Sequence, residues 1–498
     1  MTTSTHRHDL YTVDQVRALD RRAIETLGIP GFELMRRAAW AGLSSLRRQW
    51  PQAKRVAVYC GPGNNGGDGF LLAALAREAG LQVELLALDA ELHDDAARAR
   101  AAYEAAGGVV RCWDGHSPLP DADVHVDALY GTGLGRGPEP AVAVLIESIN
   151  ISGKPILALD VPSGLNADTG YCPGAAIRAD LTVSFIAAKR GLYTGQAADQ
   201  VGGLELDTLG LPDELWRPLL ADAELMQVQV LPPRARSAHK GDNGHVLAIG
   251  GDHGTAGAIR LCAEASLRAG AGLVSVATQL TNLSALNAAR PELMAHAVNG
   301  PQALAPLLSR ASVLAVGPGL GQAAWGHALW LTALDSEKPL VLDADGLNLL
   351  ALEPRCFTHP VVLTPHPGEA ARLLGVTTQA IAIDRFAAAR MLARRYGAVV
   401  VLKGAGSLIA DMDGRLAVCP WGNPGMASGG MGDLLTGIVA ALLAQGLTPW
   451  QAACLGVGLH ARAGDEAARA GERGLIASDL LLPLRQLLNG QPPQGLGS

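Results

Sequence analysis

The sequence predicts an α/β protein with two parallel-sheet domains, and three observations support this prediction. Short apolar segments alternate with Ala- and Leu-rich helical runs along most of the 498 residues. The chain contains 60 glycines, many of them in turns that follow an expected strand. The alternation fades over 211–243 and then restarts. Because such alternation indicates parallel sheets covered by helices on both faces, we expect a domain boundary near Met226, which gives domains 1–225 and 226–498.

The first half has the pattern of a Rossmann-like parallel-sheet domain. Thr12 and Gln15 have capping-box spacing, so a helix is expected through about Leu27, and another from about Phe32. A glycine-rich loop at 61–67 precedes the next helix. Apolar strands are expected at 55–60, 82–87, 124–128, 156–159 and 181–185, with helical runs at 68–79, 94–106 and 141–149.

The second half repeats the alternation and then becomes mostly helical from Gly432. Two segments, 407–410 and 415–418, are expected to form a hairpin because Asp411 to Gly414 between them are turn-forming residues. The other expected strands are 245–249, 273–277, 313–316, 339–342, 361–364 and 399–402.

Composition narrows the class of protein. The net charge is −7 and no long basic run is present, so nucleic acid is not expected as a partner. The seven cysteines form no CxxC pair, which argues against a zinc ribbon or a disulfide framework. The first residues have no apolar signal segment, and the longest apolar stretch, 434–447, is too short to span a bilayer. We therefore expect a cytoplasmic protein without a membrane partner.

A glycine-rich loop, GPGNNGGDGF, runs from Gly61 to Phe70 between an expected strand and helix. Backbone N–H groups at such a helix start bind anions, although a turn without ligand remains possible. Asp127 and Asp160 each end another strand and begin another loop, so three loops meet at one sheet edge. Either aspartate alone could simply cap its loop. The rigid turn after Asp160, which contains Pro162 and Gly164, favours a fixed carboxylate for acid–base chemistry.

Taken in order, GNNGGDG, DALYGTGLGRG and DVPSGL resemble the N-terminal domain of YjeF proteins, the NAD(P)HX epimerase family, over residues 10–215. The resemblance implies a hydrated cofactor, NADHX or NADPHX, as substrate, and K⁺ in the site. It implies that Asp160 is the catalytic residue and that K⁺ is bound by Asn65, Asp127 and Ser163. The substrate-binding residues it implies, besides Asp160, are Asn64, Asn65, Gly66, Gly67, Asp68, Gly131, Thr132, Gly133, Leu134, Gly135, Arg136 and Gly137.

A second glycine-rich loop, NPGMASGGMGD, leads into the helix expected from Gly432. Its N–H groups can hold a transferring phosphoryl group, and Asp433 can accept a hydroxyl proton, as in ribokinase-type enzymes. Lys403, after the strand at 399–402, could meet a nucleotide phosphate or lie in a solvated turn. His366 and Glu369 follow another strand, where Glu369 could bind Mg²⁺ or cap the next helix.

The ordered motifs GTAGA, VGPGLG, DADGLN, TPHPGE, VLKGAGS and NPGMASGGMGD resemble the NAD(P)HX dehydratase family, the ribokinase-like C-terminal domain of YjeF proteins, over residues 230–490. Ser428 and Gly346 depart from its usual threonine and alanine. The resemblance implies Asp433 as the catalytic residue and Mg²⁺ as cofactor. It implies substrate contacts from Gly257, Ala258, Gly319, His366 and Asp433, and ADP or ATP contacts from Lys403, Gly404, Ala405, Gly406, Ser407 and Gly432.

Three functions are compatible with these motifs. A bifunctional repair enzyme would epimerise NAD(P)HX and dehydrate the S epimer at the expense of ADP or ATP, because phosphorylation turns the C6 hydroxyl into a good leaving group. A small-molecule kinase with an accessory domain would release a stable phosphorylated product instead. An N-terminal binding module would show no epimerisation. We favour the repair enzyme, since both halves indicate the same substrate, and we expect a homo-oligomer.

Overall fold

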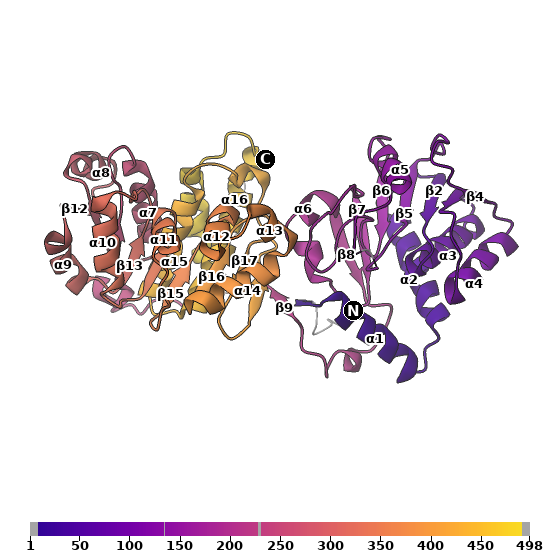
Figure 1. The fold of residues 1–498 in the computed structure, drawn as a ribbon, viewed down its shortest axis with the longest axis horizontal. Helices are drawn as coiled ribbons and strands as arrows, with labels where there is room; N and C mark the ends of the chain where they lie inside the picture. Colours follow the sequence, from indigo (N-terminus) through magenta and orange to yellow (C-terminus); the bar gives the residue numbers. More distant parts are fainter. Residues whose placement is uncertain (1–7, 134, 228–230, 491–498) are drawn as a thin grey trace. The chain divides into compact units, whose positions relative to one another are not determined.

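The computed structural model describes residues 8–133, 135–227 and 231–490. The chain divides into two compact units, Met1–Glu224 and Leu225–Ser498. Each unit is an α/β structure in which helices flank a largely parallel sheet, as Figure 1 shows. This arrangement confirms the predicted fold class.

The first unit is built on a seven-stranded parallel sheet in the order β4-β3-β2-β5-β6-β7-β8. The five central strands are those the sequence predicts, whereas the edge strands β4 and β8 were not expected. Both edge strands are partly exposed and lack a continuous apolar run, which explains why they gave no pattern. The strands are β2 Arg55–Cys60, β3 Gln82–Ala87, β4 Val110–Cys112, β5 Val124–Ala128, β6 Ile156–Leu159, β7 Leu181–Phe185 and β8 Gly203–Asp207.

Helices cover both faces of this sheet because alternate residues of each strand point to opposite sides. On β2, Val56 and Val58 pack into the core with α1 to α4, while Ala57 and Tyr59 pack against α5. A short antiparallel pair, β1 Asp9–Leu10 with β9 Ala223–Leu225, completes the unit. The helices are α1 Val13–Glu25, α2 Gly31–Gln49, α3 Asn64–Glu78, α4 Asp94–Ala105, α5 Pro140–Asn150 and α6 Ala197–Gln200.

Helix α3 begins at Asn64, with Gly63 as its N-cap, four residues earlier than the start expected at Asp68. The early start depends on glycine, since a Cβ on Gly66 would lie 1.9 Å from the carbonyl oxygen of Gly61. Asp68 is therefore a buried residue inside the helix and does not cap it. Consequently, Asn64 and Asn65 occupy the first turn of α3.

The second unit contains nine strands in the order β12-β11-β10-β13-β14-β15-β16-β17-β18. The strands β12 to β16 in this order are parallel, whereas β17 and β18 form the expected antiparallel hairpin. Only the partly exposed edge strand β12 was not expected. The strands are β10 His245–Ile249, β11 Leu273–Thr278, β12 Met294–Ala297, β13 Val313–Val316, β14 Leu340–Leu342, β15 Val361–Leu363, β16 Val399–Leu402, β17 Leu408–Ala410 and β18 Leu416–Val418.

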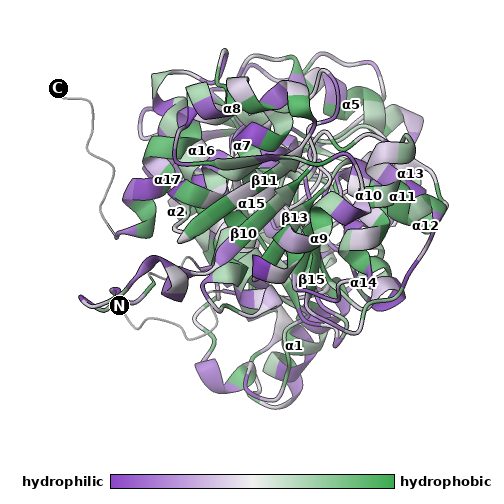
Figure 2. Ribbon diagram, turned by 90° about the vertical axis from the view of Figure 1, so that its left-hand side faces the viewer, coloured by the Kyte–Doolittle hydropathy of each residue, from purple (hydrophilic) through white to green (hydrophobic). Residues whose placement is uncertain are grey.

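Two helical layers enclose the second sheet, and Figure 2 shows its hydrophobic strands between them. Helices α7, α15, α16 and α17 share one core with the inward side chains of the central strands. The opposite layer includes α9, α10 and α14, which pack on β10, β13 and β16. The helices are α7 Ala256–Arg268, α8 Leu283–Ala289, α9 Pro301–Arg310, α10 Ala324–Leu334, α11 Asp345–Leu352, α12 Pro367–Leu374, α13 Thr378–Ile383, α14 Arg385–Tyr396, α15 Met431–Ala444, α16 Pro449–Ala467 and α17 Leu481–Leu488.

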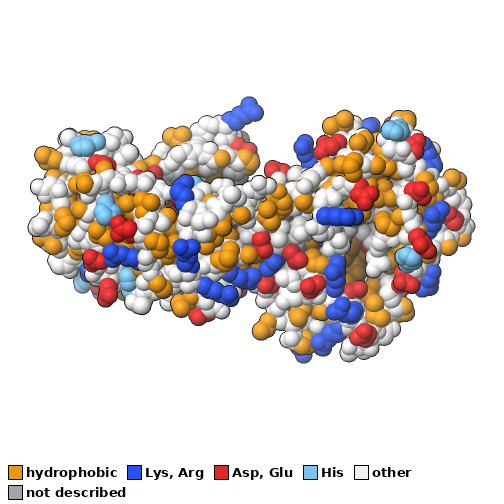
Figure 3. Space-filling model, in the orientation of Figure 1, with side chains coloured by type: hydrophobic (Ala, Val, Ile, Leu, Met, Phe, Trp, Pro, Cys, Tyr) orange, Lys and Arg blue, Asp and Glu red, His pale blue; other side chains and the backbone are white. Residues whose placement is uncertain are grey.

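Charged residues of both signs are interspersed over the face shown in Figure 3. Many pair along the helices that carry them. On α2, for example, Glu33 bonds both Arg36 and Arg37, at 2.9 and 3.1 Å. Throughout the described part of the chain, no helix has both the length and the apolar composition needed to cross a bilayer.

Candidate active sites

A cavity of about 520 Å³ opens in the first unit where β2, β5 and β6 end. The loops after these strands line it, as expected for the carboxyl edge of a parallel sheet. Of the residues predicted to bind substrate, seven line this cavity: Asn64, Asn65, Asp68, Gly131, Thr132, Gly133 and Asp160.

Asp160 is held by a lysine that sequence reasoning missed. Its backbone has φ 66°, and its Oδ1 accepts a 2.5 Å bond from the Lys189 ammonium. Lys189 also donates to Ser184 Oγ at 3.0 Å and to the Phe185 carbonyl at 2.8 Å. The lysine side chain is 1% exposed, against 16% for the aspartate. Because all three protons of the buried Lys189 ammonium are donated, the Asp160 carboxylate is held in one orientation.

Three further carboxylates line the same cavity: Asp20 from α1, Asp68 from α3 and Asp95 from α4. Burial, with the neighbouring charges of Asp160 and Asp20, raises the pKa of Asp68 well above its ordinary value. Burial and Asp160 likewise raise the pKa of Asp20. The site therefore combines a lysine-paired carboxylate with a neighbouring carboxyl group whose pKa is raised, an arrangement that suits proton transfer.

Asn65 and Gly131 face the same part of the cavity. Both amide atoms of Asn65, Nδ2 and Oδ1, are buried without a hydrogen-bond partner among the described residues. A Cβ on Gly131 would lie 3.1 Å from Asp160 Oδ2 and 3.3 Å from Asn65 Cβ. Since buried polar groups are almost always satisfied, the Asn65 amide is set to bind a ligand beside Asp160.

Asp127 and Ser163 form a buried pair at the ends of β5 and β6. Ser163 donates to the carboxylate through its hydroxyl at 2.6 Å and its backbone N–H at 2.8 Å. Ser163 Oγ also accepts the N–H of Tyr130 at 2.8 Å. Burial raises the pKa of Asp127 to about 6 despite these bonds. Ser163 also donates to the Tyr130 carbonyl at 3.1 Å, which ties the pair to the loop that precedes Gly131. Neither Asp127 nor Ser163 is among the residues that line the cavity.

Other predicted residues lie away from this cavity. Gly66 and Gly67 pack beneath it, where a Cβ on Gly67 would meet the side chain of Met35. Gly135, Arg136 and Gly137 do not line it, and Arg136 is 83% exposed and paired with Glu139. Leu134 lies outside the described residues.

In the second unit, Lys403 and Asp343 form the centre of the predicted nucleotide site. Lys403 Nζ donates to Asp343 Oδ1 at 2.7 Å, and Thr436 donates to Oδ2 at 2.9 Å. Burial alone would raise the pKa of Asp343. The charge of Lys403 and the hydrogen bonds from Lys403 and Thr436 have the larger effect, so the pKa of Asp343 is lowered. A Cβ on Gly432 would lie 3.1 Å from Lys403 Nζ. The lysine is thus anchored directly beneath the glycine-rich loop.

Asp433 lies at the start of α15, next to this ion pair. Burial, followed by the charge of Asp343, raises its pKa to about 6. Glu369 is 3.9 Å from Lys403 and accepts the His366 backbone N–H at 2.8 Å, so it caps α12. Burial raises the pKa of Glu369 to about 7. His366 Nε2 lies 3.3 Å from Glu369, which places the histidine at the same site.

The loop after β16 is folded tightly on itself. Ser407 Oγ lies 3.2 Å from the Gly404 N–H and donates to its carbonyl at 3.0 Å. Arg385, which sequence reasoning missed, is buried behind the loop and donates to the carbonyls of Leu402 and Lys403. Gly404 has φ 138°, and a Cβ there would lie 3.0 Å from the Arg385 guanidinium. Ala405, at the tip, is exposed.

The predicted substrate residues Gly319 and Gly257 belong to adjoining loops. Thr255, which precedes α7, donates through Oγ1 to the Gly319 carbonyl at 2.7 Å. The Asp252 N–H bonds the same carbonyl at 2.6 Å. Gly257 and Ala258 begin α7, close behind Thr255. The structure therefore brings these glycines to one edge of the sheet.

No cluster of three or more His, Cys, Asp or Glu side chains among the described residues could hold a metal ion by itself. Mg²⁺ in nucleotide sites needs only one or two carboxylates because phosphate oxygens and waters complete its shell. Glu369 and Asp433, both with raised pKa values, offer such carboxylates.

Comparison with known proteins identifies the family. A family described as YjeF-related protein N-terminus matches residues 31–191, and one described as NAD(P)H-hydrate dehydratase matches 246–484. A bifunctional NAD(P)H-hydrate repair enzyme of Coxiella burnetii is 47% identical over 492 residues, covering 96% of this chain and 99% of that protein. One of Escherichia coli is 46% identical, covering 97% and 94%. The chain belongs to this family.

Membership of the bifunctional NAD(P)H-hydrate repair family confirms both resemblances predicted from sequence, one for each unit. Among solved structures, the ADP/ATP-dependent NAD(P)H-hydrate dehydratase of Bacillus subtilis, co-crystallised with ATP and Mg²⁺, is 28% identical, with a TM-score of 0.47 over 52% of this chain and 93% of that one.

Proposed function

We infer that the chain repairs hydrated nicotinamide cofactors at two separate sites. The first unit interconverts (R)- and (S)-NAD(P)HX, and the second dehydrates the S epimer at the expense of ADP or ATP, giving AMP or ADP and phosphate. The observation that carries this inference is that each unit sets one carboxylate, Asp160 or Asp433, beside a glycine-rich helix start and a buried lysine.

In the first unit, Asp160 is the acid–base group at C6 of the hydrated ring. Lys189 holds its carboxylate in place, and Asp68, whose pKa is raised by burial and by the charge of Asp160, is the neighbouring group we propose as its proton-exchange partner. The N–H groups at the start of α3 and at Gly131 to Gly133 bind the phosphates of the substrate. We propose that Gly135, Arg136 and Gly137 contribute to binding these phosphates, as the family resemblance implies.

We propose that K⁺ is bound in the first unit by Asn65, Asp127 and Ser163. The unsatisfied Asn65 Oδ1 and the buried Asp127 carboxylate support this proposal. When bound, the cation would supply a fixed positive charge near the substrate phosphates.

In the second unit, Asp433 accepts the proton of the C6 hydroxyl as that oxygen attacks the terminal phosphoryl group. The N–H groups from Gly429 to Gly432 stabilise the charge on the phosphoryl oxygens. The ring nitrogen lone pair then expels phosphate from C6, and loss of a proton from C5 to solvent restores the C5–C6 double bond of NADH or NADPH. Mg²⁺ supplies additional charge neutralisation when bound, with Glu369 and Asp433 as its available carboxylates.

Binding in the second unit divides between two sets of residues. Lys403, anchored by Asp343, and the loop of Gly404, Ala405, Gly406 and Ser407 hold the nucleotide together with Gly432. The hydrated cofactor is bound by Gly257, Ala258, Gly319 and His366, which share the carboxyl edge of the sheet.

Separated NADHX epimers incubated with ADP or ATP, with and without K⁺, test the function. We expect NADH and free phosphate from the S epimer, and consumption of the R epimer that depends on the first unit. A stable phosphorylated product would instead indicate a kinase. Unchanged epimerisation in Asp160→Asn would indicate that the first unit is a binding module. Light scattering of the full chain checks the predicted homo-oligomer, and fractionation of cells checks the predicted cytoplasmic location.

A further inference from the structure

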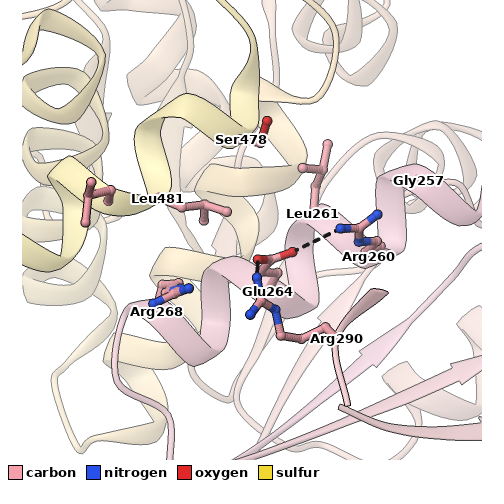
Figure 4. A pocket seen from close by; sticks show the side chains of 9 residues that line it. Gly257, Arg260, Leu261, Glu264, Arg268, Arg290, Ser478 and Leu481 are labelled. Atoms are coloured by element: carbon pink, nitrogen blue, oxygen red, sulfur yellow. Dashed lines mark hydrogen bonds and ion pairs between the residues drawn. The ribbon is translucent and has the colours of Figure 1, made fainter. Parts of the chain in front are cut away.

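A second cavity, of about 550 Å³, lies in the second unit on the outer side of α7. Figure 4 shows it between α7 and the segment that leads into α17. It begins at Gly257, the proposed substrate contact, and extends along the helix. The residues that define it are Gly257, Arg260, Glu264, Arg268, Arg290 and Leu481.

The cavity is strongly basic. Glu264, whose side chain is 6% exposed, bonds Arg290 and lies 3.7 Å from Arg260. In Figure 4 its carboxylate points between these two guanidinium groups. One carboxylate cannot neutralise three arginines. Within the described part of the chain, the Arg268 side chain has no hydrogen-bond or ion-pair partner, and Arg290 Nε is buried without one.

The basic groups follow one face of α7 in sequence order. Gly257, Arg260, Glu264 and Arg268 are three or four residues apart, which is the spacing of a single helix face. At a rise of 1.5 Å per residue, Arg268 lies about 16 Å along the axis from Gly257. An elongated ligand that starts at the catalytic edge would therefore meet Arg260 first and Arg268 last.

We propose that this cavity holds the adenosine half of the dinucleotide substrate during dehydration. Arg260 and Arg290 bind its diphosphate, and Arg268 binds the 2′-phosphate that distinguishes NADPHX from NADHX. Guanidinium groups suit this role because their planar fork bonds phosphate oxygens in pairs. Leu261 and Leu481 provide apolar walls for ribose and base. The proposal rests on the proposed contact of Gly257 with the substrate.

The volume and the wall chemistry favour a small ligand. Cavities of about 300 to 1,000 Å³ with apolar walls and a few charged groups are typical of small-molecule sites. The cavity is continuous with Gly257, the proposed substrate contact. The adenosine half of the substrate must extend away from the catalytic edge, and this cavity is where we place it. The second unit would then act better on NADPHX than on NADHX.

Kinetics of the full chain with (S)-NADPHX and (S)-NADHX test the proposal. In Arg268→Ala we expect KM for NADPHX to rise about tenfold, since a charge-assisted bond is lost, with kcat and the KM for NADHX within about twofold. In Arg260→Ala we expect KM to rise for both substrates. The matched control is Arg485→Ala, an exposed arginine on α17 outside the cavity, which should change neither constant.

Equal KM values for NADPHX in Arg268→Ala and wild type would overturn the proposal. So would a rise of the same size for both substrates, because that result would mean that Arg268 does not bind the 2′-phosphate. A wild-type chain without dehydration activity would count against the proposed function instead. Unchanged melting temperature and epimerisation in each variant show that folding is intact.

Discussion

At the scale of single residues, Asp160 and Asp433 are both proposed to transfer protons, but their surroundings differ. Asp160 is neutralised by a buried lysine that bonds it at 2.5 Å. Asp433 has no such bond to Lys403, whose ammonium is engaged by Asp343. Burial and the Asp343 charge therefore dominate and raise the pKa of Asp433 to about 6. A pKa just below neutrality suits a general base.

The first prediction concerns the pH dependence of dehydration. Because Asp433 must be deprotonated to accept a proton, kcat should rise with pH through about 6 and level off above it. Asp433→Asn should lower kcat by about 10²- to 10⁴-fold and leave epimerisation unchanged. A pH series with phosphate release as readout measures both. Glu369→Gln is the control, and loss of the rise near pH 6 in that variant would assign the titration to Glu369.

The second prediction concerns Lys189. Lys189→Met leaves the partly buried Asp160 carboxylate without its partner, so the free energy of unfolding of the first unit should fall by about 3 kcal/mol. Epimerisation should fall sharply while dehydration persists. Adding Asp160→Asn to this variant should recover part of the stability, as urea denaturation would show. Full additivity of the two changes would contradict a coupled pair.

At the scale of elements, the proposed phosphoryl transfer depends on the start of α15. Gly430 is its N-cap with φ 90°, a conformation that L side chains rarely adopt. A Cβ there would also lie 2.6 Å from Leu261 Cδ1 on α7. The two helices approach so closely because this position has no side chain, and their starts lie at the same sheet edge.

The third prediction compares neighbouring glycines in that loop. Gly430→Ala should lower kcat for dehydration at least about tenfold, because the strained backbone moves the N–H groups that stabilise the phosphoryl charge. Gly429→Ala should cause a smaller loss, since it keeps its backbone N–H and a Cβ there meets no described atom within 4 Å. Phosphate release by both variants measures this difference. Equal losses would show that the backbone conformation at Gly430 is not the cause.

At the scale of the whole molecule, the chain has two units with separate cores, and each unit is proposed to catalyse one reaction of the same substrate.

The fourth prediction uses an equal mixture of NADHX epimers with ADP or ATP. Wild type should convert all of it, and Asp160→Asn should stop once the S epimer is used. Adding the Asp433→Asn chain should restore the missing half, with NADH absorbance as readout. No recovery would mean that substrate does not pass freely between chains.

Most of the fold could be predicted from sequence because the central strands are continuous apolar runs. The strand at 55–60 was expected where β2 lies, and it is buried along nearly its whole length. The edge strands β4, β8 and β12 could not be predicted, since they are partly exposed and their side chains follow no clear period. Edge strands are set by pairing with a neighbour, which a local pattern does not encode.

The candidate sites, like the fold, could be predicted only in part from the sequence. The place of Asp160 at the end of a parallel strand, before a rigid turn, indicated this residue. The glycine-rich loop that leads into a helix indicated Asp433. Nothing local marked Lys189, Arg385 or the Thr436 hydroxyl as site residues. Each acts through a partner distant in sequence, namely Asp160, the carbonyl of Leu402 and Asp343.

The sequence by itself determined the α/β class, the two sets of motifs and the family, because strand period, glycine turns and motif order are local. Only the tertiary structure decided which charges meet. It paired Lys189 with Asp160, directed Lys403 to Asp343, and set Arg260 and Arg290 beside Glu264, with Arg268 in the same cavity. The physical reason is that burial and Coulomb interaction depend on distances in space. Those distances set the pKa of Asp433, and they underlie the direction proposed for an extended substrate.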